Sequence, residues 1–226
     1  MEKIVISLGG SLVVPDKIDV SFLRDFKNFL LEEIKHGRRF FIIVGGGQTC
    51  RNYQKAAQEV SKISNDDLDW LGICSCRLNA LLVRAVFGDI AYPEIITDLG
   101  ILTDKINNSI VVLGPNKPGS SSDLGAVQIA QNVGAKKVIN LSNIDYVYDS
   151  DPKMNPNAKK FEEISWAEYR KLIPKEWNPG LNTPFDPIAS EIAEKEGIEV
   201  IIMNGKPIDN LVKYLNGEKF FGTVIK

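Results

Sequence analysis

The most constraining feature of this sequence is a set of short, apolar, β-branched segments that alternate with helix-like stretches. Short apolar runs bounded by glycine are typical of buried strands, whereas apolar residues spaced three and four apart indicate helices. The strand-like runs are residues 3–8, 38–44, 94–97, 109–114, 136–141, 198–204 and 222–226. Regular alternation of strands and helices predicts an α/β layered fold with a mostly parallel central sheet.

Helical spacing predicts the other half of this pattern. Helices are expected at residues 19–37, 48–63, 66–87, 122–133, 165–173, 186–197 and 207–215, with a short one between 98 and 108. In the longest helix, one buried stripe is predicted from Leu68, Leu71, Leu78, Leu81, Leu82 and Val86. Asp186 is expected to cap the helix at 186–197, with Pro187 as its first residue. No repeat or clear linker interrupts the chain, which predicts a single domain.

Composition excludes several classes of function. The 226 residues include 27 basic and 29 acidic side chains, for a net charge of −2, whereas nucleic-acid binding usually needs a strong basic excess. Cys50, Cys74 and Cys76, with the single histidine His36, suit neither a disulfide framework nor a zinc site. No signal peptide is visible, and no uninterrupted apolar run approaches the roughly 18 residues of a membrane span. We therefore expect a cytoplasmic protein with reduced thiols.

Three loops of small residues follow predicted strands and could bind phosphate groups. They are Gly9-Gly10-Ser11, Gly45-Gly46-Gly47 and residues 118–123. The last two lead directly into helices, whose N-termini attract anions. The triple glycine matches neither the Walker A loop nor the G-x-G-x-x-G fingerprint. Because ligands of parallel sheets bind at the carboxyl ends of strands, the three loops together predict a site for polyanions.

Other polar residues leave alternatives open. Arg51, one turn into the helix after the triple glycine, could bind a phosphate held by that loop, or it could form a surface ion pair. Asn143, Asp145, Tyr148 and Asp151 could line a nucleobase slot with Tyr148 against the base, or they could form a β-hairpin with Asx turns.

Arg77 and Asn79 lie inside an otherwise apolar helix and therefore need hydrogen-bond partners. Another helix is the expected partner, including one at an oligomer interface. His36 is expected to be a solvated residue at a helix end, with no chemical role.

Taken in order, these motifs resemble the amino acid kinase superfamily and, within it, uridylate (UMP) kinases of the archaeal type. The resemblance is carried by ISLGGS, VGGGQTCR, DWLGICSCRLNALL, PGSSSD, LSNIDYVYDSDP and FDPIASEIAEKEGIEVIIMNG, which run from the first strand to the last. It implies a three-layer α-β-α sandwich, with an acceptor-binding part near residues 1–135 and an ATP-binding part near 136–226. It also implies transfer of the γ-phosphoryl group of ATP, with Mg²⁺, to UMP in pyrimidine biosynthesis, and a homohexamer assembled from dimers.

The resemblance also assigns residues. Gly10, Gly47 and Arg51 are expected at the transferring phosphoryl group. The ATP-binding residues are expected to be Gly9, Gly10, Ser11, Gly47, Arg51, Ser142, Asn143, Tyr148 and Asp151. The UMP-binding residues are expected to be Gly46, Asp69, Asn116, Lys117, Pro118, Gly119, Ser120, Ser121 and Ser122. No metal ligand is expected from the protein itself.

Three departures from the family's pattern bear on the substrate. Ser7 stands where many members have a lysine, which the archaeal-type branch also lacks. The candidates to replace that lysine are Lys117, Lys153 and Lys159. Residues 117–123 read KPGSSSD instead of HPGxTTD, and Tyr146 replaces a glycine. These changes leave open another enzyme of the superfamily with a different phosphate or carboxylate acceptor, or a non-catalytic relative that binds a nucleotide or oxyanion.

Overall fold

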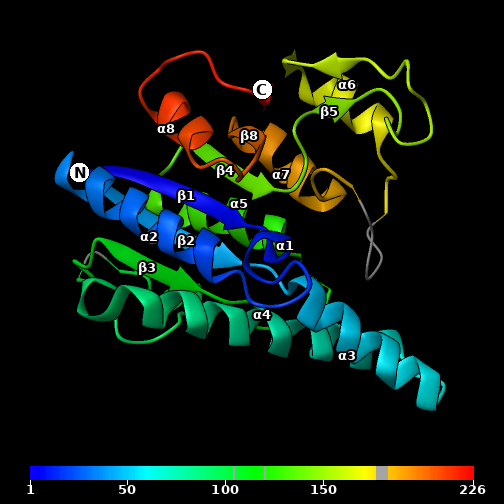
Figure 1. The fold of residues 1–226 in the computed structure, drawn as a ribbon, viewed down its shortest axis with the longest axis horizontal. Helices are drawn as coiled ribbons and strands as arrows, with labels where there is room; N and C mark the ends of the chain where they lie inside the picture. The colour runs from blue at the N-terminus through cyan, green and yellow to red at the C-terminus, as the bar shows by residue number, and fades with distance from the viewer. Residues whose placement is uncertain (104, 120, 177–182) are drawn as a thin grey trace.

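The computed structural model of the protein describes residues 1–103, 105–119, 121–176 and 183–226 (Figure 1). These residues form a seven-stranded sheet in the order β3-β2-β1-β4-β8-β9-β7 and a separate pair, β5-β6. The strands are β1 Glu2–Leu8, β2 Arg38–Val44, β3 Ile110–Leu113, β4 Lys137–Ser142, β5 Val147–Tyr148, β6 Lys160–Phe161, β7 Glu163–Ile164, β8 Glu199–Asn204 and β9 Thr223–Ile225. The strands from β3 to β8 in this order are parallel, and β9 runs antiparallel to β8. The predicted, mostly parallel sheet is confirmed.

Helices cover both faces of the sheet, which confirms the three-layer α-β-α arrangement. The helices are α1 Gly10–Val13, α2 Val20–Lys35, α3 Gly47–Val60, α4 Asn65–Phe87, α5 Ser122–Val133, α6 Trp166–Leu172, α7 Pro187–Glu196 and α8 Asp209–Leu215, with 3₁₀ turns η1 Gly88–Ile90 and η2 Leu99–Ile101. One core cluster packs α1, α2, α4 and α8 on the sheet, and the other packs α5, α6 and α7 on the opposite face. Phe40 and Phe41, adjacent on β2, are both buried but belong to different clusters, because successive strand residues point to opposite faces.

Local capping signals mark the ends of α5 and α7, which cover the face of the sheet opposite α2 and α4. Ser121 Oγ accepts from the N–H of Leu124 at the start of α5. Asp186 Oδ1 accepts from the N–H of Ala189 at the start of α7, with Pro187 as first residue, which confirms the prediction for this helix. Gly134 and Gly197 end α5 and α7 with positive φ angles of 72° and 61°, a conformation that favours glycine. The N-termini of α5 and α7 lie in contact at the carboxyl edge of the sheet, because Asp186 N–H donates to Asp123 Oδ2 (3.2 Å).

The buried stripe predicted for the longest helix is wrong in part. Leu68 is buried and Leu71, Leu82 and Val86 are half-buried in α4, but Leu78 and Leu81 are 57% and 50% exposed. The helix buries a different set, which includes Ile73, Ala80, Val83 and Phe87. Because α4 is apolar on more than one side, periodicity alone could not identify the side that packs on the sheet.

Two short elements also differ from the prediction. Residues 94–97 form no strand: only Ile96 pairs, through an isolated parallel bridge to Leu113 at the edge of the sheet. The helix expected between 98 and 108 is a single 3₁₀ turn, Leu99–Ile101, and residue 104 lies outside the described residues. Helix α1 begins directly at Gly10 and was not predicted, since four residues are too few to show a helical period.

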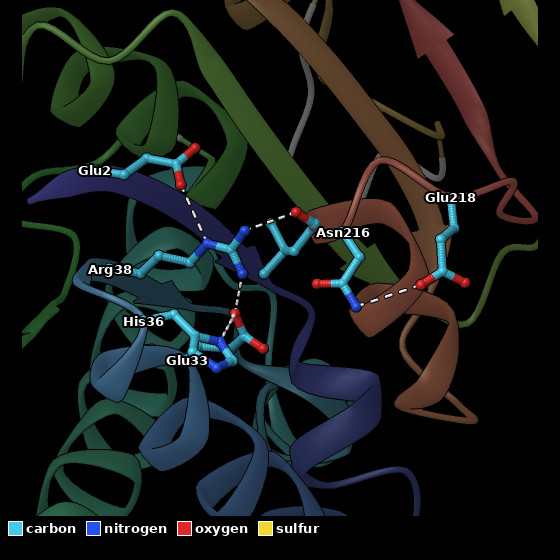
Figure 2. A network of polar contacts seen from close by, with 7 residues as sticks. Glu2, Glu33, His36, Arg38, Asn216 and Glu218 are labelled. Atoms are coloured by element: carbon cyan, nitrogen blue, oxygen red, sulfur yellow. Dashed lines mark hydrogen bonds and ion pairs between the residues drawn. The ribbon is translucent and has the colours of Figure 1, made fainter.

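A network around Arg38 ties four elements together at the amino end of the sheet, opposite the glycine loops (Figure 2). Arg38 on β2 donates to Glu2 of β1 (Nε to Oε2, 3.1 Å), to Glu33 of α2 and to the carbonyl of Leu215 at the end of α8 (2.7 Å). The buried Glu33 carboxylate thus has a cation, as a buried charge requires. His36, the exposed C-cap of α2, lies 3.8 Å from Glu33, as expected for a helix-end residue.

The stretch Asn65–Ile90, which comprises α4 and η1, is long and apolar enough to cross a membrane by length and composition alone. The sequence prediction considered only uninterrupted apolar runs and did not single it out. Here α4 packs on β2, β3 and α3, and its Arg77 and Asn79 side chains donate to backbone carbonyls. A helix of a layered fold can meet the same criterion, and these contacts show that one side of α4 packs on the sheet.

Candidate functional site

The two glycine loops meet at the carboxyl edge of the sheet. A Cβ on Gly10 would collide with the backbone of Gly45 and Gly47, and a Cβ on Gly47 would collide with the carbonyl of Gly10. Gly47 also has a φ of +60°, which suits glycine. The backbones can approach this closely only without side chains, so the loop after β1 and the triple glycine after β2 form one continuous surface.

Asn79 holds the triple glycine in place. Its buried side chain donates from Nδ2 to the carbonyls of Gly45 (2.9 Å) and Gly46 (3.0 Å). The predicted helix–helix partner for Asn79 is therefore wrong, because α4 packs across the end of β2 and brings the amide to the loop. The contact fixes the carbonyls on one side of the loop.

Arg51 lies on α3 within one turn of the triple glycine. Gly46 is the N-cap of this helix and offers no side-chain hydrogen bond, and a helix N-terminus favours an anion. The Arg51 guanidinium is exposed and donates from Nε to Gln48 Oε1 (3.0 Å). Its position is compatible with binding a phosphate at Gly47, which stays a prediction.

Helix α4 also holds the third loop. Gly119 N–H donates to Asp69 Oδ2 (2.8 Å), and Arg77 Nε donates to the carbonyl of Pro115 (2.9 Å). Arg77, like Asn79, thus serves a loop instead of a second helix. The structure brings together Asp69 and Gly119, which the sequence assigned to one ligand although 50 positions of the chain separate them.

The remaining residues of this loop lie at the start of α5. Ser121 is its N-cap and Ser122 its first residue, whereas Ser120 lies outside the described residues. A cavity of about 600 Å³ next to the loop is lined by residues that include Asn116, Lys117 and Ser121. Asn116 and Lys117 are exposed and Pro118 is half-buried.

Residues 143–151 contain the first strand of a β-hairpin, whereas its second strand, at residues 160–161, lies beyond this segment. A hairpin was the alternative that the sequence left open. β5 pairs antiparallel with β6, and Asp151 Oδ1 accepts from the N–H of Lys153 (2.9 Å) in an Asx turn. Tyr148 on β5 is half-buried, with its ring edge-on to that of Tyr146 at 6.4 Å. Asn143 and Asp151 are exposed.

A cavity of about 420 Å³ joins this hairpin to the segment after β8. Its lining includes Asp145, Tyr148, Asn204, Lys206, Asn210 and Lys213. Asn204 Nδ2 donates to Asp145 Oδ1 (2.8 Å) across it. Tyr148 therefore lines a cavity, and its contact with a nucleobase stays a prediction, whereas Ser142, Asn143 and Asp151 lie outside the lining of this cavity. The residues after β8 were missed, although they follow the carboxyl end of a parallel strand, which is where such sheets bind ligands.

Ser7, which stands where the family's lysine is expected, joins a polar network beneath the glycine loops. Ser7 Oγ and Asn140 Nδ2 both donate to Asp123 Oδ1, at 3.0 and 2.9 Å. Burial, together with the nearby Asp186 carboxylate, raises the pKa of Asp123 to about 7, although its hydrogen bonds oppose the shift. Asp186 Oδ2 is buried without a hydrogen-bond partner among the described residues. The hydroxyl of Ser7 thus takes the lysine's place without supplying a positive charge.

One edge of the sheet carries the glycine loops, the helix N-termini and the two cavities. In an α/β sandwich, this arrangement is typical of a protein that binds phosphate-bearing ligands. The particular family follows from comparison with known proteins: the chain belongs to the amino acid kinase family, whose model matches residues 2–204. The family predicted from the motifs is confirmed.

Two relatives that match over nearly their full length, and one solved structure, are uridylate kinases. The chain is 35% identical to the uridylate kinase of Pyrococcus abyssi (strain GE5 / Orsay) over 99% of each chain. It is also 35% identical to the uridylate kinase of Methanospirillum hungatei JF-1, over 100% of this chain and 95% of the relative. The crystal structure of uridylate kinase from Archaeoglobus fulgidus superimposes with a TM-score of 0.81 at 30% identity, with both chains fully covered.

Proposed function

We propose that this protein is a UMP kinase, which transfers the γ-phosphoryl group of ATP to UMP and forms UDP and ADP. The observation that carries the proposal is the contact between the backbones of Gly10 and Gly47, because it sets a donor loop directly against an acceptor loop. Full-length similarity to curated uridylate kinases supports the choice of acceptor.

The chemistry suits a site made of backbone and loops. A phosphate oxygen of UMP attacks the γ-phosphorus as the bond to the β–γ bridging oxygen breaks. The nucleophile is already anionic near neutral pH, so the reaction needs no general base. What remains for the protein is to align two polyanions and to spread the charge of the transition state.

We assign each candidate residue to ATP, to UMP or to the phosphoryl group in transfer. Gly9, Gly10 and Ser11 bind the ATP phosphates, Gly46 binds the phosphate of UMP, and Gly47 with Arg51 faces the group in transfer. Asp69 holds the UMP ribose, and residues 116–122 surround the nucleotide. Ser142, Asn143, Tyr148 and Asp151 belong to the ATP base and ribose side; the cavity beside Tyr148 supports this assignment for that residue.

Mg²⁺ fits this site as a partner of ATP. Within the described ranges, no three His, Cys, Asp or Glu side chains gather into a metal site, and the Asp123 oxygens already accept from Ser7, Asn140 and the backbone of Asp186. Mg²⁺ commonly keeps several waters and binds through substrate phosphates. When bound, it neutralises phosphate charge. The positioning falls to Gly10, Gly47 and Arg51.

The proposal extends to the whole chain. The acceptor-binding part covers roughly residues 1–135 and the ATP-binding part roughly residues 136–226, and the phosphate loop at Gly9-Gly10-Ser11 carries ATP phosphates to the boundary between them, within one continuous sheet. The exposed apolar side of α4, which includes Trp70, Leu78 and Leu81, supports assembly of copies into dimers and of dimers into a hexamer. We also propose a cytoplasmic location, which the free cysteines support.

A coupled assay of ADP release, with Mg·ATP and a panel of UMP, CMP, GMP and AMP, tests the function. We expect turnover that UMP stimulates most. Absence of UMP-stimulated turnover would contradict the proposal. A preference for a non-nucleotide phosphate or a carboxylate would instead identify another activity of the family, and ATP binding without transfer to any acceptor would identify a non-catalytic relative.

A further inference from the structure

We propose that Lys206 binds the phosphates of ATP, and that its ion pair with Asp19 holds the ammonium group beside the site until the nucleotide arrives. This inference rests on the proposed use of ATP. It supplies a cation that the predicted ATP-binding residues lack on the β8 side of the site.

Lys206 lies between the two parts of the ATP site. It lines the 420 Å³ cavity together with Tyr148. The preceding residue, Gly205, donates its N–H to the carbonyl of Ser142 (3.0 Å), and a Cβ there would collide with Leu12 of α1. Helix α1 begins at Gly10, so a nucleotide with its base against Tyr148 and its phosphates at α1 passes Lys206.

The present partner of Lys206 marks the direction of its side chain. Lys206 Nζ lies 2.5 Å from Asp19 Oδ2 and 5.6 Å from the centre of the Phe22 ring. Asp19 in turn donates its N–H to the carbonyl of Val13, the last residue of α1 (2.9 Å). The ammonium group therefore sits at one end of α1, while the phosphates are expected at the other.

This ion pair is weak enough to exchange. The side chains of Lys206 and Asp19 are 44% and 24% exposed, and ion pairs in contact with water contribute little to stability. The lysine side chain is long and flexible and carries three donors. A polyphosphate offers it several charge-assisted hydrogen bonds, against the one that Asp19 provides.

The other candidate cations are placed less well. Lys153 and Lys159 lie in the exposed turn between β5 and β6, where their backbone N–H groups bind Asp151 and Asp149. Lys117 lies on the acceptor loop. Arg51 approaches from α3, on the side of the triple glycine. Lys195, in the last turn of α7, is exposed and lies outside the lining of the cavity that Lys206 lines, which makes it the control.

Calorimetry with a non-hydrolysable imido analogue of ATP, in the presence of Mg²⁺, tests the role of Lys206. In Lys206→Met we expect the analogue to bind about 10- to 100-fold more weakly, the loss typical of one charge-assisted hydrogen bond. Adenosine, which has no phosphate, should bind as in the parent. Lys206→Arg should restore most of the affinity, and Lys195→Met should change it less than about 3-fold, as for a charge that makes no direct contact.

Asp19→Asn tests the exchange of partners. Asparagine caps a helix as well as aspartate does, so α2 keeps its start, while Lys206 loses its anionic partner. We expect the analogue to bind roughly 2- to 5-fold more tightly, the range of an exposed ion pair.

Four outcomes would overturn the inference: unchanged affinity for the analogue in Lys206→Met, equal losses for the analogue and for adenosine, equal effects of Lys206→Met and Lys195→Met, or no gain in Asp19→Asn. Turnover of the parent with UMP is a separate readout. A parent that binds the analogue without phosphorylating UMP contradicts the proposed function, whereas calorimetry still decides the role of Lys206.

Discussion

Removing the charge of Asp69 should weaken the binding of UMP and leave the binding of ATP unchanged. Asp69 Oδ2 accepts from Gly119 N–H (2.8 Å), and an asparagine can accept the same hydrogen bond. Asp69→Asn therefore keeps the loop but weakens the hold on ribose hydroxyls. We expect the KM for UMP to rise about 10-fold, the value of a hydrogen bond to a charged group, with the KM for ATP unchanged. Steady-state kinetics measure both, with Asp66→Asn, in the first turn of the same helix, as control. An unchanged KM for UMP would remove Asp69 from the site.

Asp123 should make stability depend on pH. Its pKa is about 7 in the folded protein, against 3.8 for an ordinary aspartate, so between about pH 4 and 7 the folded state holds a proton that the unfolded state has lost. Stability from this group is full below pH 4 and is lost as the pH rises through 7. Asp123→Asn cannot ionise, so its free energy of unfolding relative to the parent should increase between pH 4 and 7 and then level off.

Urea denaturation at several pH values between 4 and 8 measures this difference for Asp123→Asn. The variant also gives up the acceptor for Asp186 N–H, which offsets its stability by a constant amount and leaves the pH trend intact. Asp16→Asn, an exposed acid, is the control. Parallel pH curves for parent and Asp123→Asn would show that the carboxyl is already ionised well below pH 7.

Residue types near the site were easier to predict than their partners. Glycines after strands indicated a close backbone approach, and the resemblance placed Gly10 and Gly47 at the same phosphoryl group, but no local pattern showed that their backbones would touch. Asn79 was recognised as a buried amide in need of partners, and the loop that it binds lies 33 and 34 residues away. Lys206 lies in a stretch without a phosphate motif, and only the pairing of β8 with β4 brings it to the site.

At the scale of elements, α4 acts as the support for two loops, through Asn79 at the triple glycine and through Asp69 and Arg77 at residues 115–119. Asn79→Ala leaves two loop carbonyls without their donor. We expect a loss of about 1–3 kcal/mol in the free energy of unfolding, or a fall in Tm of roughly 2–4 °C per kcal/mol for a chain of this size. The KM for UMP should rise as well.

Ser75→Ala separates these two effects of Asn79→Ala. Ser75 is also buried on α4, but its Oγ donates within the helix, to the carbonyl of Leu71 (2.8 Å). It should lower Tm by a similar or smaller amount and leave the KM for UMP unchanged. If Asn79→Ala affected only Tm, the glycine loop would not need this anchor to bind its ligand.

Elements with strong local signals were predicted well, and elements defined by their neighbours were not. Helix α7 has an N-cap, a proline at its first position and a terminal glycine, all readable in the sequence. By contrast, residues 94–97 have the composition of a strand, yet only Ile96 finds a partner at the sheet edge. The orientation of α4 likewise depends on the surfaces of β2, β3 and α2 that it covers.

At the scale of the whole molecule, the site exists only because distant segments converge. Asp69 meets Gly119, and Lys206 meets Asp19 across 187 positions of the chain. Alternation of strands and helices predicted the layers and the edge that carries the ligands. The strand order β3-β2-β1-β4-β8 decides which loops become neighbours, and local pattern carries no information on that order. The resemblance to a known family instead indicated which loops serve one ligand, without giving the strand order.

From the exposed side of α4 we predict that copies of the protein assemble through this helix. Trp70, Leu78 and Leu81 are 42%, 57% and 50% exposed and recur along one helix, and large apolar side chains gathered on one exposed element favour a protein interface. We expect the parent to be an oligomer in light scattering coupled to size exclusion. Leu78→Glu should reduce its mass, because a carboxylate buried at an interface without a partner is costly. Its helix content should stay the same, since Leu78 makes little contact within one chain.

Met154→Glu is the control for Leu78→Glu, because Met154 is 83% exposed in the turn between β5 and β6, away from α4. It should keep the mass of the parent. A monomeric parent, or an equal loss of mass in both variants, would contradict the interface on α4. Since Leu78 lies between Arg77 and Asn79, which hold the acceptor loops, a rise in the KM for UMP in Leu78→Glu but not in Met154→Glu would further indicate that contact between copies supports the acceptor site.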